Sequence, residues 1–173
     1  PTMIPATEDS GGRSGSKMAP HPLCDTLQYV AGDYLCWGGN PTKKKNEAGF
    51  EPYINALRHW SEWAGNKKLS SVYTYLRKGC LIGDLVKNEV LFGDDENKLL
   101  AKWDDKTEEA PSIFKILKAS NKKGQFEAFV RFSVEIPEDP SAHLWEDTEI
   151  QSLWIEYYPT LLQEEGLCMS KGT

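Results

Sequence analysis

The segment with the clearest chemical potential is rich in glycine and serine and lies near the start of the chain, Gly11-Gly12-Arg13-Ser14-Gly15-Ser16-Lys17. Glycine lets backbone amides approach phosphates or a nucleic-acid groove closely, and Arg13 and Lys17 supply positive charge. Two further basic runs, Lys43-Lys44-Lys45 and Lys67-Lys68, are expected to add charge near it. The alternative is a flexible surface segment without a ligand.

Nucleotide hydrolysis does not fit this segment. A phosphate-binding loop of the Walker type needs Gly-Lys-Ser/Thr in direct succession after an apolar strand. Here Ser16 separates Gly15 from Lys17, and no strand pattern precedes them.

The residues needed for nucleophilic or metal chemistry are few and scattered. Histidines stand only at 21, 59 and 143, and no serine lies in a GxSxG motif. The four cysteines, at 24, 36, 80 and 168, form no CxxC pair, and no second pair accompanies His21 and Cys24. We therefore expect reduced thiols, no bound metal or cofactor, and no enzymatic activity. A thiol enzyme is kept as a third hypothesis for function, after the DNA-binding and protein-interaction hypotheses described below.

Charge divides the chain into two unequal parts. The 173 residues carry a net charge of −6, with 39% hydrophobic and 27% charged residues, as in a soluble globular protein. Residues 1–80 hold ten basic and seven acidic side chains, whereas residues 81–173 hold 10 and 19. The acidic total argues against indiscriminate polyanion binding but leaves room for a basic face on the first half. No apolar run is long enough for a membrane span.

The elements that must position these residues are mainly helices. Apolar residues recur at helical spacing over 47–64 and 69–78, and the short connection through Gly65 predicts an antiparallel helical hairpin. A third helix is expected over 147–165, kinked near Ile155 by Pro159 and capped by Gly166, and a short one over Ser112–Ala119.

Strands are fewer. Residues 126–136 alternate between apolar and polar and predict a strand, with a weaker one over Leu99–Trp103; residues 26–31 suit either a strand or a helical turn. The predicted fold class is α+β, a helical hairpin and further helices packed beside a small, mainly antiparallel sheet. We expect a flexible Gly/Ser/Pro-rich loop over 1–22 and a single α+β domain over 23–173.

Three segments together resemble a known family. Gly15–Thr26 followed by Tyr29-Val30-Ala31-Gly32, the helix beginning near Phe50, and Leu144–Trp154 running to Gly166-Leu167-Cys168 match it in order and spacing. The family is the large subunit (Csd, or Cas-eight, family) of the type I-C CRISPR Cascade. His21 and Pro22 depart from the frequent Asn and Phe, and Trp145 replaces a frequent His. The chain resembles an internal piece of the N-terminal domain of that subunit.

The resemblance implies a non-catalytic, DNA-binding role in antiviral defence in the bacterial cytoplasm. The implied partners are double-stranded target DNA, the crRNA-bearing Cascade subunits and a recruited helicase–nuclease. The large subunit would read the PAM, and guide pairing would read the remaining sequence. The implied nucleic-acid-binding residues are Gly15, Ser16 and Lys17, supported by His21, with Lys43, Lys44 and Lys45 as positioning contacts to phosphate.

The main alternative is a protein-interaction module without a nucleic-acid role. Its acidic second half would dock a basic partner. Salt dependence separates the two, because DNA binding through several phosphates weakens steeply as salt rises.

Overall fold

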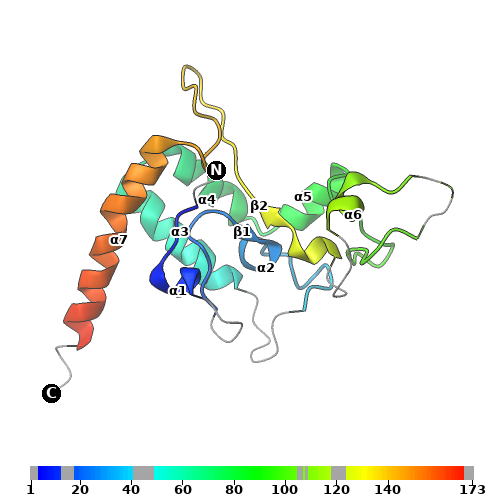
Figure 1. The fold of residues 1–173 in the computed structure, drawn as a ribbon, viewed down its shortest axis with the longest axis horizontal. Coiled ribbons are helices and arrows are strands. Elements are labelled where there is room, and N and C mark those ends of the chain that lie inside the picture. Colours follow the sequence, from blue (N-terminus) through cyan, green and yellow to red (C-terminus); the bar gives the residue numbers. More distant parts are fainter. Residues whose placement is uncertain are drawn as a thin grey trace.

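The computed structural model describes residues 4–12, 18–40, 49–104, 107, 109–117 and 124–169, with side chains up to residue 162. The described elements are mostly helical and are accompanied by one two-stranded antiparallel sheet, which confirms the α+β prediction (Figure 1). Their bounds are α1 Glu8–Gly11, β1 Asp25–Thr26, α2 Leu27–Val30, α3 Phe50–Ala64, α4 Lys67–Leu76, α5 Leu81–Lys87, α6 Ser112–Ile116, the 3-10 turn η1 Gly124–Glu127, β2 Phe129–Val130 and α7 Thr148–Met169.

Helix α3 is the centre of the packing. Its predicted apolar stripe is buried at Tyr53, Ile54, Leu57 and Trp60, and α2, α4 and α7 all pack against it. Trp60 meets Trp154 of α7 edge to face at 5.0 Å between ring centroids. Burial of these large side chains removes much apolar area from water and so stabilises the helix cluster.

The hairpin of α3 and α4 has a tighter connection than predicted. Gly65 ends α3 in the left-handed conformation, with φ of 59°, and Asn66 immediately caps α4 by accepting hydrogen bonds from the backbone N–H groups of Lys68 and Leu69. The predicted bounds of 69–78 therefore lie two residues too far along the chain at both ends. Only two residues separate the helices, so α4 must fold back onto α3.

The predicted strand over 126–136 is mostly irregular. Only Phe129–Val130 pairs regularly, antiparallel to Asp25–Thr26, while Gly124–Glu127 forms a 3-10 turn. The alternation of faces was nevertheless right, because Phe132 is buried and Arg131 and Ser133 are exposed. Residues 131–145 continue as a protruding antiparallel ribbon, with the Val134 N–H donating to the Ala142 carbonyl (Figure 1).

Three other predictions need correction. Residues 99–103 form no strand, and Leu99 makes only an isolated bridge with Gly93. Helix α7 continues past Gly166, its predicted end, to Met169. Helix α5 was not predicted from the sequence. Helix α6 starts at the predicted Ser112 and ends at Ile116.

The predicted loop over 1–22 contains the short helix α1. A capping box between Thr7 and Ser10 begins it, and the Tyr158 hydroxyl of α7 accepts a hydrogen bond from the Glu8 N–H at 3.0 Å. The indole N–H of Trp154 also donates to the Ala6 carbonyl. Flexibility elsewhere in 1–22 and a domain boundary at residue 23 stay predictions.

Candidate nucleic-acid interface

Of the predicted nucleic-acid-binding residues, the structure describes His21. Gly15, Ser16, Lys17 and Lys43–Lys45 lie outside the described residues. His21 is half-buried, and its Nδ1 lies 3.0 Å from the hydroxyl of Ser10 in α1. Its backbone N–H donates to Asp25 Oδ2 at 2.7 Å. The His21 ring is thus held by the fold.

A fixed turn follows the Gly15–Lys17 segment. Asp25 is fully buried, and its carboxylate accepts hydrogen bonds from the backbone N–H groups of His21 and Thr26, both at 2.7 Å. The buried hydroxyl of Tyr53 donates to the Leu23 carbonyl at 2.7 Å. Charge-assisted bonds to a carboxylate are among the stronger hydrogen bonds, so this turn is a rigid base for the segment before it.

The two basic segments rejoin the described fold at neighbouring residues. Met18 directly follows Lys17, and Gly49 follows Lys45 by four residues. A side-chain carbon on Gly49 would lie 3.2 Å from Met18 Cε and 2.2 Å from Tyr29 Cδ1. The second distance is a clash, so glycine is required for this close approach. Residues 31 positions apart in the sequence therefore meet beside Tyr29.

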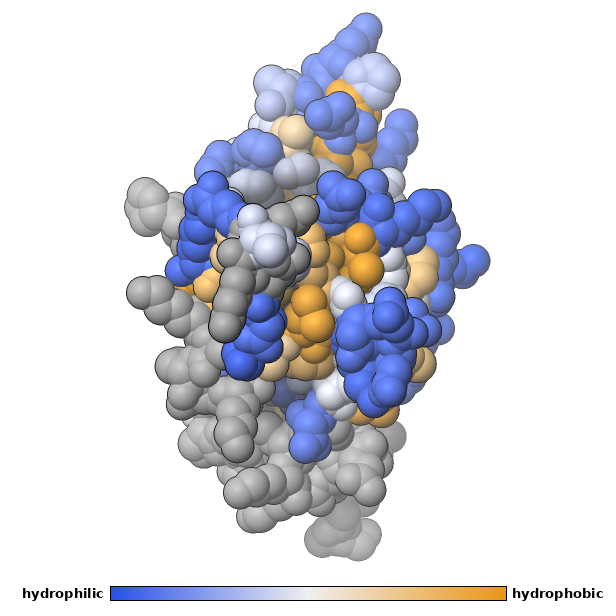
Figure 2. Space-filling model, turned by 90° about the vertical axis from the view of Figure 1, so that its right-hand side faces the viewer, coloured by the Kyte–Doolittle hydropathy of each residue, from blue (hydrophilic) through white to orange (hydrophobic). Residues whose placement is uncertain are grey.

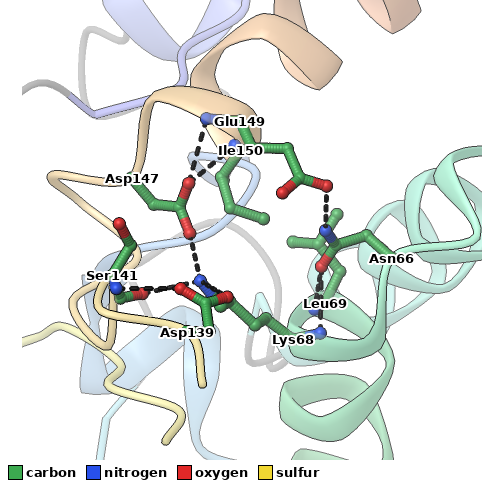
Figure 3. A network of polar contacts seen from close by, with 8 residues as sticks. All are labelled: Asn66, Lys68, Leu69, Asp139, Ser141, Asp147, Glu149 and Ile150. Carbon is green, nitrogen blue, oxygen red and sulfur yellow. Dashed lines mark hydrogen bonds and ion pairs between the residues drawn. The ribbon is translucent and has the colours of Figure 1, made fainter. Parts of the chain in front are cut away.

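The Lys67-Lys68 pair does not act as one basic patch. Lys67 is exposed, but Lys68 is only 3% exposed, and its ammonium group contacts Asp147 Oδ2 at 2.5 Å, Asp139 Oδ2 at 2.7 Å and the Ser141 carbonyl at 2.6 Å (Figure 3). The expectation that Lys68 adds charge to a nucleic-acid surface is therefore wrong, because its charge is already neutralised inside the protein.

This Lys68 network joins three parts of the chain. Asp147 also caps α7 by accepting from the Glu149 N–H at 2.9 Å, and the Asn66 side chain donates to Glu149 at 3.0 Å (Figure 3). Burial opposes the charge of Lys68, but the bonds to Asp139 and Asp147 prevail and raise its pKa. The bond from Lys68 in turn lowers the pKa of Asp139. The network fixes the starts of α4 and α7 and the ribbon relative to one another.

Cys24, Cys36 and Cys80 are free thiols. Cys24 is buried, and burial raises its pKa to about 11. Burial and a hydrogen bond to Asp84 raise the pKa of Cys80. A thiol nucleophile needs a lowered pKa, so neither environment activates its cysteine.

Within the described ranges, no three His, Cys, Asp or Glu side chains gather in a way that would hold a metal ion. His21 and Cys24, which have a ligand-like spacing in the sequence, are instead engaged separately, with His21 at Ser10 and Cys24 in the core.

Comparison with known proteins identifies the family. A family model described as CRISPR-associated protein (Cas_Csd1) matches residues 1–173. The chain therefore belongs to the Cas_Csd1 family of CRISPR-associated proteins, which confirms the resemblance. Neither the comparison with curated proteins nor the one with solved structures found a match. No described helix is both long and apolar enough to cross a membrane.

One feature of the surface was not predicted. The cations Arg77 and Lys78 at the end of α4 are exposed, like Lys67 at its start. The signal was available, because residues 67–78 contain no aspartate or glutamate in a chain of net charge −6.

Proposed function

We propose that this protein is a DNA-binding, non-catalytic part of the large subunit of a type I-C CRISPR surveillance complex, and that it contributes to PAM recognition in the bacterial cytoplasm. Family membership supports the CRISPR role. The observation that carries the DNA role is the close approach of Met18 and Gly49, which brings the residue after Lys17 near the residue four positions after Lys45.

The two segments would have different tasks. Gly15 and Ser16 would approach base edges, because small residues allow the backbone into a groove. Lys17 and Lys43–Lys45 would contact phosphates and set the position of the duplex without reading its sequence. His21 and Asp25 would hold the base of the first segment, as their hydrogen bonds support.

The proposed partners follow from this division of labour. Target duplex DNA would be read at its PAM here, guide RNA held by other Cascade subunits would read the rest, and a separate helicase–nuclease would cut. The raised pKa of Cys24 and Cys80 supports the absence of thiol catalysis in this part.

The test is duplex binding by the assembled complex at two salt concentrations. The duplexes carry the guide-matched sequence beside a randomised flank, so that affinity and flank preference are measured together. Lys17→Ala should weaken binding to all flanks and flatten the salt slope by about one charge. Gly15→Val should reduce discrimination between flanks through a clash.

The control is Lys87→Ala, which removes an exposed cation from α5 and should change neither property. If Lys17→Ala and Gly15→Val both behave like this control, the Gly15–Lys17 segment is not the reader. If the unmodified complex does not bind these duplexes, the DNA role itself is wrong. Binding without salt dependence would contradict the phosphate contacts proposed for Lys17 and Lys43–Lys45.

A protein-interaction role is the second candidate. Figure 2 shows an apolar area on the end of the molecule that carries α5 and α6, surrounded by hydrophilic residues. Val90 and Ile116 at this end are 51% and 75% exposed. Exposed apolar patches often mark protein contacts, and Ile116→Asp should release a protein partner without changing DNA affinity.

A further inference from the structure

The outer face of α4 carries an unusual combination of side chains. Six exposed residues at helical spacing form what we call the α4 stripe: Lys67, Ser70, Ser71, Thr74, Arg77 and Lys78. Cations stand at both ends and three hydroxyls stand between them. The twelve residues from Lys67 to Lys78 make eleven steps, and at the helical rise per step the two ends lie about 16 Å apart.

Among the described residues, the cations of the α4 stripe have few partners, one being the Tyr75 ring, whose centroid lies 5.7 Å from the Lys78 ammonium group. Within the described residues, no ion pair involves Lys67, Arg77 or Lys78. By contrast, Lys98 pairs with Glu96 and Lys102 with Asp104. Asp84 of α5 accepts a hydrogen bond at 2.9 Å from the hydroxyl of Tyr75, which lies beside the stripe on α4.

The hydroxyls of the stripe line a surface hollow. Ser70, Ser71, Thr74, Tyr75 and Lys78 surround a shallow space of about 400 Å³. Ser71 donates to the Lys67 carbonyl within the helix, but Ser70 and Thr74 make no side-chain hydrogen bond to the described residues. Their hydroxyls therefore remain available as donors to an outside acceptor.

Helix stability explains only part of this arrangement. Positive side chains stabilise a helix at its C-terminal end, which accounts for Arg77 and Lys78, but they oppose the helix dipole at the N-terminal end. Lys67 stands in the first turn of α4, where there is no acid. Its neighbour Lys68 is compensated by Asp139 and Asp147, whereas Lys67 is not.

We propose that the α4 stripe is a second, sequence-independent contact to the phosphate backbone of the duplex DNA. Lysine, arginine and small hydroxyl side chains are the groups that proteins use for phosphate contacts. One strand of duplex carries a charge every 3.4 Å, so about 16 Å of helix face several phosphates. This inference rests on the proposed DNA role but concerns different residues. The α4 stripe would increase the affinity for duplex DNA without contributing to the preference for a flank sequence.

The experiment uses the assembled complex and the same duplexes with randomised flanks. The triple variant Lys67→Gln/Arg77→Gln/Lys78→Gln should weaken duplex binding at least about tenfold at 0.1 M salt. The slope of log affinity against log salt concentration should fall by up to about 2.7, with flank preference unchanged. The matched control Lys87→Gln/Lys98→Gln/Lys102→Gln also removes three exposed cations, and it should leave affinity and slope unchanged.

A second variant tests the centre of the stripe. Thr74→Glu removes no cation and is compatible with an exposed helix position, but it places a negative charge in the hollow and should also weaken binding to every flank. The inference is overturned if the unmodified complex binds DNA while both α4 variants match the control. If the unmodified complex does not bind duplex DNA, the proposed function itself is wrong. This outcome differs from failure of the α4 inference because it is seen without any variant.

Discussion

Helices α4 and α7 pack against the same helix, α3, but their charged residues have opposite signs. Residues 67–78 contain four cations and no acid, whereas residues 148–169 contain acids and no lysine or arginine. Both bury an apolar stripe, with Leu69 and Leu76 on α4 and Ile150 and Tyr157 on α7. The shared packing therefore determines where the helices lie, while their outer residues determine what each can bind.

The two helices also differ in how many large apolar side chains they leave exposed. Helix α7 leaves Ile155 and Leu162 70% and 50% exposed, and its far end extends away from the other elements (Figure 1). No large apolar side chain of α4 is exposed. The α4 surface suits an anion, and the α7 surface suits a protein contact.

The Lys68 network joins these two helices, so breaking it should have the largest effect on stability. Lys68→Met leaves the buried carboxylate of Asp147 without its partner and should lower the free energy of unfolding by about 3–5 kcal/mol. Lys67→Met, one residue away on the exposed face, should change it by less than about 0.5 kcal/mol. Urea unfolding of both variants measures the difference; equal losses would mean that the network stabilises little.

The same network predicts an acid-sensitive contribution to stability. The hydrogen bond from Lys68 lowers the pKa of Asp139, so this stabilisation is present above the unfolded carboxyl pKa and is lost as pH falls through the lower folded pKa. Asp139→Asn should therefore cost more stability at pH 7 than at pH 3. In a Lys68→Met background this pH dependence of the substitution should largely disappear, and its persistence would contradict the coupling.

The contribution of Lys68 to stability has the opposite pH dependence and is lost at alkaline pH. Because its folded pKa is raised, its contribution is complete below the unfolded lysine pKa and is lost as pH rises through the folded value.

The exposed face of α7 should give the smallest effect. Ile155→Ser removes an apolar group that is mostly in water already, so the free energy of unfolding should change by less than about 0.5 kcal/mol. Ile150→Ser, on the buried face of the same helix, is the control and should be strongly destabilising. A large loss for Ile155→Ser would show that this face is covered in the protein, contrary to the contrast drawn with α4.

Local patterns in the sequence determined the main helices. The 3.6-residue spacing around Trp60 and Ile150 predicted α3 and α7 because one side of each helix must leave water. Alternation over 126–136 similarly predicted which side of that segment faces inward, with Phe132 buried. Regular pairing was not predictable from the same residues, because a strand needs a partner and β1 supplies only two residues.

Contacts between distant residues were decided by the tertiary structure. Lys67 and Lys68 have the same chemistry and adjacent positions, but only Lys68 meets Asp139 and Asp147, more than 70 residues away, so one lysine is neutralised and the other is free for an outside anion. The meeting of Met18 and Gly49 likewise depends on packing around Tyr29. A one-dimensional pattern records which groups are present, whereas burial and long-range contacts determine which charges remain available to bind.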